Sequence, residues 1–63
     1  METGKVKFYN TLKNYGYIKN ERDGRDYYFT FNDCTDLVSP GDRVSFEIGN
    51  SPRGPKAKTV TAI

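Results

Sequence analysis

Turn-forming residues interrupt this chain every few positions, and no segment keeps a helical period for two turns. Between the interruptions lie short runs of β-branched and aromatic residues, which is the pattern of short strands. We expect five strands, over residues 5–10, 15–20, 26–31, 43–49 and 57–62. The Asp-, Ser- and Pro-containing residues 32–41 predict a loop with room for one helical turn, and residues 50–55 are not expected inside a strand.

Five short strands predict an all-β fold, a small antiparallel barrel, because closing the sheet removes edges that would pair with other chains. Alternation is clearest in residues 43–49, where Val44, Phe46 and Ile48 share one face. The predicted core consists of Val6, Ile18, Tyr27, Phe29, Val44, Phe46, Ile48 and Val60. We expect one domain over residues 1–63, with a core too thin to hide all five tyrosines and four phenylalanines.

Aromatic residues recur at alternate positions beside lysines. Tyr15 and Tyr17 share one face of a strand, Ile18 takes the other, and a second aromatic run follows in residues 26–31. Rings on a solvated face are unfavourable unless something stacks on them, and nucleic-acid bases are the usual partner. The alternative is that the rings only cover a thin core, since half-exposed tyrosine is often structural. Lysines in three separate segments favour nucleic acid.

Charge is distributed unevenly, although the net charge is only +2. Residues 1–20 carry four lysines against one acid, and residues 50–63 carry three cations and no acid. Residues 21–49 carry seven acids against three arginines. If the fold joins the two ends, one side of the molecule becomes basic.

The residue inventory argues against an enzyme. The chain has no histidine, so its single cysteine, Cys34, has neither a zinc-binding partner nor a base to activate it. Glycine-rich phosphate loops are absent, so we expect no catalytic residue, metal, cofactor or small-molecule substrate. A lone cysteine, no signal-like start and no apolar run of membrane length predict a cytoplasmic protein without a membrane partner.

Five stretches, in order along most of the chain, resemble a cold-shock domain. They are Gly4–Asn10, Lys13–Ile18, Asp26–Phe31, Gly41–Glu47 and Arg53–Val60. The resemblance implies a five-stranded Greek-key OB-type barrel that binds single-stranded RNA and single-stranded DNA, in a family whose members act mainly as RNA chaperones. By position, it implies a nucleic-acid-binding surface made of Lys7, Phe8, Lys13, Tyr15, Tyr17, Asp26, Tyr28, Thr30, Phe31, Arg53 and Lys56.

Several positions depart from the family pattern. Phe8 stands at the place of a surface tryptophan, Asn14 replaces a glycine, and Thr30 replaces a histidine of the stacking surface. The loop over residues 32–41 is shorter than usual and lacks an aromatic residue. We therefore expect a binding surface that is poorer than the family's or differently tuned.

Phe8 receives two conflicting predictions. Strict alternation places both Val6 and Phe8 in the core, whereas the family resemblance places Phe8 outside. The second arrangement requires a bulge or strong twist near Lys7 and Phe8.

A flat aromatic face suits unstacked bases, and no predicted helix could enter a major groove, so single strands are the expected partners. The rival interpretation is a small protein-interaction barrel, in which Tyr15, Tyr17 and Tyr28 receive an extended proline-rich peptide. We expect a monomer, and the sequence leaves a dimer open.

Overall fold

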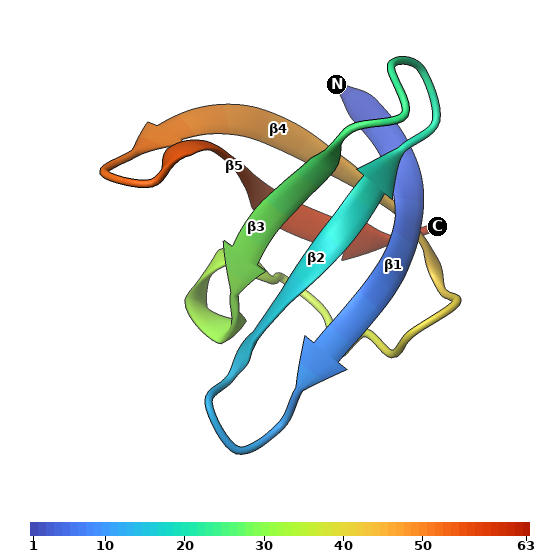
Figure 1. Ribbon diagram of the computed structural model, residues 1–63. Coiled ribbons are helices and arrows are strands. Elements are labelled where there is room, and N and C mark those ends of the chain that lie inside the picture. The colour runs from blue at the N-terminus through green and yellow to red at the C-terminus, as the bar shows by residue number, and fades with distance from the viewer.

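The computed structural model describes residues 1–63, and its strands close into a barrel (Figure 1). The strands are β1 (Glu2–Asn10), β2 (Tyr15–Asn20), β3 (Asp26–Thr30), β4 (Arg43–Ser51) and β5 (Gly54–Ala62). Around the barrel their order is β1-β2-β3-β5-β4, with β4 pairing back to β1. The predicted all-β, OB-type barrel is confirmed. Four neighbouring pairs are antiparallel, and a short parallel contact between β3 and β5, at Tyr28 and Lys56, completes the closure.

The strand boundaries follow the sequence pattern with local differences. β2 has the predicted bounds, β1 begins earlier at Glu2, and β3 ends at Thr30 because Phe31–Asp33 form a single 3-10 turn. The prediction that residues 50–55 lie outside strands is wrong at both ends, since only Pro52 and Arg53 separate β4 from β5. The chain reverses there with a φ of 109° at Gly54, a conformation that glycine adopts without steric cost.

The core lies inside the barrel and matches the predicted set at seven of its eight positions. It consists of Val6, Ile18, Tyr27, Phe29, Val44, Phe46, Ala57 and Val60. Ile48 was predicted to be buried but is 41% exposed, and its cross-strand partner Ala57 is fully buried instead.

The error at Ile48 has a geometric cause. The β4–β5 register shifts between Ser45 and Glu47, and Thr59 on β5 has a φ of 52°. A bulge of this kind bends the paired strands. Beyond it, the β4–β5 hairpin projects past the body of the barrel, on the left of Figure 1, and carries Ile48 out of the core.

A second bulge decides the orientation of Phe8. In the β1–β2 pairing Val6 lies opposite Ile18, and Phe8 lies opposite Tyr17, which leaves Lys7 as the extra residue. Val6 is 2% exposed and Phe8 is 42% exposed. The bulge expected from the family resemblance is therefore present, and the prediction from strict alternation is wrong.

Candidate nucleic-acid interface

Four aromatic rings from three adjacent strands form one continuous group, called here the ring patch: Phe8, Tyr15, Tyr17 and Tyr28. The register sets Phe8 of β1 opposite Tyr17 of β2, and Tyr17 opposite Tyr28 of β3. Ring centroids of neighbouring members are 5.8–6.2 Å apart, within the range of favourable aromatic pairs. Phe8 is exposed and the three tyrosines are half-buried, so the patch presents a partly solvated aromatic face.

The ring patch is held close to the core by Gly16, which lies between two of its tyrosines. A Cβ at Gly16 would lie 2.3 Å from the carbonyl oxygen of Phe8 and 3.0 Å from the ring of Phe29. Only glycine permits this approach of β2 to β1 and to the core. The spacing of Tyr15 and Tyr17 around a glycine thus has a packing reason.

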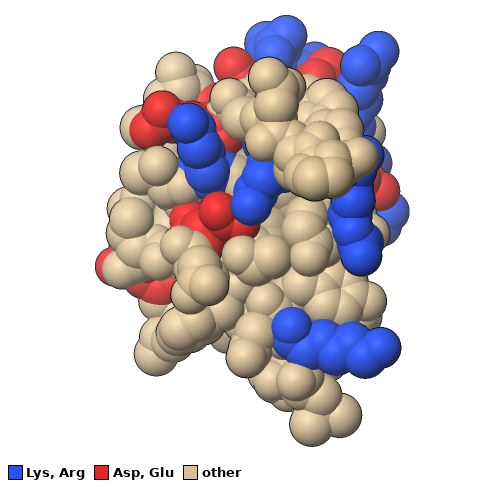
Figure 2. All heavy atoms as spheres, turned by 90° about the vertical axis from the view of Figure 1, so that its left-hand side faces the viewer, with Lys and Arg blue, Asp and Glu red and all other residues tan.

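Cations border the ring patch at the β4–β5 hairpin, which carries Arg53, and at the loop between β1 and β2, which carries Lys13. The guanidinium carbon of Arg53 lies 5.0 Å from the centroid of the Tyr28 ring, which is a cation–π distance. Arg53 and Lys13 join Tyr15, Tyr17 and Tyr28 around an open hollow of about 290 Å³. Figure 2 shows Lys and Arg side chains spread around an uncharged area of this side of the molecule, with acidic atoms on the left and at the top.

Lys7 and Asp26 form an ion pair beside the ring patch. The Lys7 Nζ donates to Asp26 Oδ2 at 2.9 Å, and the side chains are 58% and 41% exposed. An ion pair this exposed contributes little to stability because water screens it. Both side chains therefore remain available to a ligand.

Lys56 and Thr30 belong instead to an internal network around Asp33. The Lys56 Nζ lies 2.6 Å from Asp33 Oδ2, and their side chains are only 21% and 15% exposed. The same carboxylate accepts hydrogen bonds from the backbone N–H and the hydroxyl of Thr30, each at 2.9 Å. Burial alone would raise the pKa of Asp33, but the hydrogen bonds from Lys56 and Thr30 outweigh it and lower that pKa. Thr30 thus fastens the 3-10 turn to β3, and Lys56 fastens it to β5.

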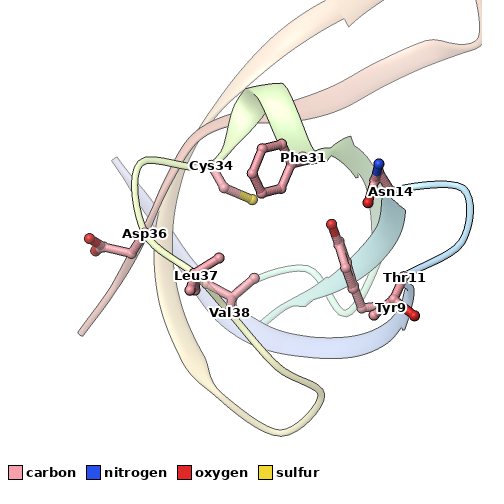
Figure 3. A pocket seen from close by; sticks show the side chains of 8 residues that line it. All are labelled: Tyr9, Thr11, Asn14, Phe31, Cys34, Asp36, Leu37 and Val38. Atoms are coloured by element: carbon pink, nitrogen blue, oxygen red, sulfur yellow. The ribbon is translucent and has the colours of Figure 1, made fainter.

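Phe31 lies apart from the ring patch. It is 51% exposed and lines a second hollow, of about 210 Å³, with Tyr9, Cys34 and Val38. In Figure 3 the side chains of Phe31 and Cys34 reach into this hollow from one side and those of Tyr9 and Val38 from the other. Sequence reasoning missed this hollow, and the one signal for it was the apolar pair Leu37 and Val38 within a polar loop.

Cys34 sits in this second hollow as a half-buried thiol that packs against the core. Burial, with a smaller contribution from the negative charge of Asp33, raises the pKa of the thiol. The protonated thiol is therefore the dominant form at neutral pH.

Residues 2–63 match the family model described as the 'Cold-shock' DNA-binding domain. The chain belongs to the cold-shock domain family. This is a family of nucleic-acid-binding proteins whose members generally bind single strands. The barrel and its ring patch thus belong to a protein from a family whose ligands are nucleic acids.

Curated members of the family align over nearly the whole chain. The cold shock-like protein CspD of Bacillus cereus is 42% identical, with 97% of each chain covered. The cold shock-like protein CspA of Vibrio cholerae is 34% identical, over 97% of this chain and 93% of its own. The Retron Se72 cold shock-like protein of Salmonella heidelberg is 35% identical and covers both chains fully.

The structure contains neither a membrane-spanning helix nor a cluster of potential metal ligands. None of its helical segments has the length and apolar character needed to cross a membrane. His, Cys, Asp and Glu side chains do not gather in any group of three or more that could hold a metal ion.

Proposed function

We propose that this protein binds single-stranded RNA and single-stranded DNA by stacking bases on the ring patch. The observation that supports the proposal most strongly is the grouping of the four rings, drawn from three strands, beside the cations Lys7, Lys13 and Arg53. Each base stacked on an aromatic side chain contributes about 1–3 kcal/mol, with little dependence on base identity. Part of that gain is offset by the ordering of a flexible strand, so the expected affinity is moderate.

The three cations supply contacts to phosphates in this proposal. Lys13 and Arg53 border the hollow beside the tyrosines, and Lys7 can exchange its exposed bond to Asp26 for a bond to a phosphate. When Lys7 leaves, the Asp26 carboxylate becomes free to accept a hydrogen bond from a base edge. Binding should weaken with salt by about 0.7 logarithmic units per phosphate neutralised.

Lys56, Thr30 and Phe31 have smaller roles in this proposal than the family resemblance implies. Lys56 and Thr30 bond to Asp33, and Phe31 lines the second hollow. We therefore assign the main contacts to the four rings and the three cations beside them.

The biological activity that follows is that of a cytoplasmic RNA chaperone. A protein that binds unpaired segments and not duplexes shifts the folding equilibrium of RNA by mass action, with no need for ATP. Its effect on a transcript should therefore depend on protein concentration and reverse on dilution.

Titration of a fluorescent oligothymidine at two salt concentrations tests the proposal. We expect the protein to bind the oligothymidine, and to bind it more weakly at the higher salt concentration. In a second assay, a hairpin RNA beacon should increase in fluorescence when the protein opens it. Absence of oligothymidine binding near physiological salt, with binding of an extended proline-rich peptide instead, would favour a protein-interaction barrel.

A further inference from the structure

Two lysines face each other on neighbouring strands of the barrel. Lys5 of β1 lies directly opposite Lys19 of β2 in the antiparallel register. Both are exposed, and neither takes part in an ion pair. Like charges directly opposite each other on a sheet repel, so this arrangement is unfavourable in the free protein.

The neighbouring acids leave this pair of lysines largely uncompensated. Glu21 lines the same depression as the two lysines, but its two carboxylate oxygens already bond to Arg43, at 2.8 and 3.0 Å, and to the hydroxyl of Thr3. Asp26, which lies opposite Lys19 on β3, bonds to Lys7. The two ammonium groups therefore stand as a local excess of positive charge.

The lysine pair lies on the same face of the sheet as the ring patch. Lys19 follows Tyr17 by two positions on β2, so their side chains share a face about 7 Å apart along the strand. Figure 1 shows β2 running from the loop that carries Lys13 to the opposite end of the barrel, where Lys19 lies. Cations thus occupy both ends of the line formed by Tyr15 and Tyr17.

The surface beside the lysine pair is hollowed. Lys5, Lys19, Asn20, Glu21 and Gly24 line an open depression of about 290 Å³. Gly24 lies at its edge with a φ of 72° and with nothing within 4 Å of the place of its missing Cβ. Both lysine side chains are exposed, so they can be reached from solvent.

We propose that Lys5 and Lys19 form a phosphate-binding extension of the ring patch. A strand whose bases stack on Tyr15 and Tyr17 continues along β2, and its backbone passes over the lysine pair. A phosphate between the two ammonium groups relieves their repulsion. The extension rests on the proposed function and adds to it a longer footprint on the nucleic acid.

The test compares oligothymidines of two lengths, about four and about ten nucleotides. The variants are Lys5→Gln, Lys19→Gln and the double variant, with Lys58→Gln on β5 as the control that removes one exposed positive charge elsewhere. For the longer strand we expect the double variant to reduce the salt slope of binding by about 0.7, because the one phosphate contact is lost, and each single variant to reduce it by less. For the short strand we expect the affinity to stay within about twofold of wild type, because the ring patch alone holds it.

The outcomes separate this inference from the proposed function. If the variants lose as much affinity for the short strand as for the long one, or if Lys58→Gln loses as much as they do, the effect is one of general charge. Either result would overturn the proposed phosphate-binding extension. A salt slope of the double variant equal to that of wild type would also overturn the extension. In that case the proposed function would still hold, provided that the wild-type protein binds the oligothymidines. If the wild-type protein binds neither strand, both proposals fail together. Because both lysines are exposed, the melting temperature of the double variant should equal or exceed that of wild type.

Discussion

The guanidinium of Arg53 lies over the ring of Tyr28, with its central carbon 5.0 Å from the ring centroid. Arg53 comes from the tip of the β4–β5 hairpin and Tyr28 from β3, so the contact links a projecting turn to the barrel wall. A base that approaches Tyr28 meets a planar cation already in place. Arg53 can therefore stack on the base or bond to its phosphate, which lysine cannot do equally.

Substitution of Arg53 should separate its two roles. In Arg53→Ala we expect weaker binding and a salt slope smaller by about 0.7, because one phosphate contact is lost. In Arg53→Lys the slope should stay near that of wild type, while the affinity at high salt falls because the stacking plane is lost. Titrations across a series of salt concentrations measure both quantities. Binding of Arg53→Lys as tight as that of wild type at every salt concentration would contradict the stacking role, and equal salt slopes in Arg53→Ala and wild type would contradict the phosphate contact.

Enlargement of the Phe8 ring should strengthen binding. The bulge at Lys7 turns Phe8 outward, where it is 42% exposed, so a larger ring meets no core atoms. We expect Phe8→Trp to bind oligothymidine roughly two- to fivefold more tightly, because the indole offers a wider stacking surface. Quenching of the new tryptophan fluorescence on binding provides the measurement. An unquenched tryptophan would show that this position lies outside the footprint.

Loss of the internal ion pair should lower stability more than it lowers binding. Lys56→Met leaves the Asp33 carboxylate, which is 15% exposed, without its cationic partner. We expect the free energy of unfolding to fall by about 1–3 kcal/mol. Chemical denaturation measures it, with Lys58→Met on the exposed outer side of β5 as the control, expected within about 0.5 kcal/mol of wild type. Equal stability of the two variants would contradict a structural role for Lys56.

Acid should weaken the contact between Glu21 and Arg43. The hydrogen bonds from Arg43, and a smaller one from Thr3, lower the pKa of Glu21 from 4.5 to about 2 despite opposing desolvation. Because the folded-state pKa is depressed, this stabilisation is complete above pH 4.5 and is lost as the pH falls toward 2. Thermal melts from pH 6 to 2 should show a smaller acid-induced loss in Glu21→Gln than in wild type. Parallel pH curves for the two proteins would contradict the assignment.

Periodicity and turn residues predicted most of the fold because the core is simple. Val6, Ile18 and Phe29 alternate with exposed or half-buried neighbours, and such alternation identifies a buried face without knowledge of the pairing. The failures lie where pairing geometry overrides alternation. Ile48 lies beyond a bulge whose extra residue is on the partner strand β5, so the sequence of β4 gives no sign of it. The burial of Ala57, which pairs with Ile48, depends on the register of the two strands.

The candidate site could be predicted only in part, because neighbours across strands are not visible in sequence. Alternation alone predicts that Tyr15 and Tyr17 share one face of a strand. The outward orientation of Phe8 could be predicted only from the family resemblance, because it depends on the bulge at Lys7. The ion pair of Lys56 with Asp33 joins β5 to the turn after β3, and no local sequence pattern predicts it. The opposition of Lys5 and Lys19 likewise appears only once the β1–β2 register is known.

The central claim is that bases stack on the rings of adjacent strands, and paired substitutions of Tyr17 and Tyr28 test it most directly. The two rings lie 5.9 Å apart and opposite each other in the β2–β3 register. We expect Tyr17→Ala and Tyr28→Ala each to weaken oligothymidine binding by about 1–3 kcal/mol, with a salt slope like that of wild type, since stacking and not charge is lost. Tyr17→Phe and Tyr28→Phe, which keep the rings, should bind within a few-fold of wild type. Alanine variants that remain folded and bind as tightly as wild type would contradict the claim.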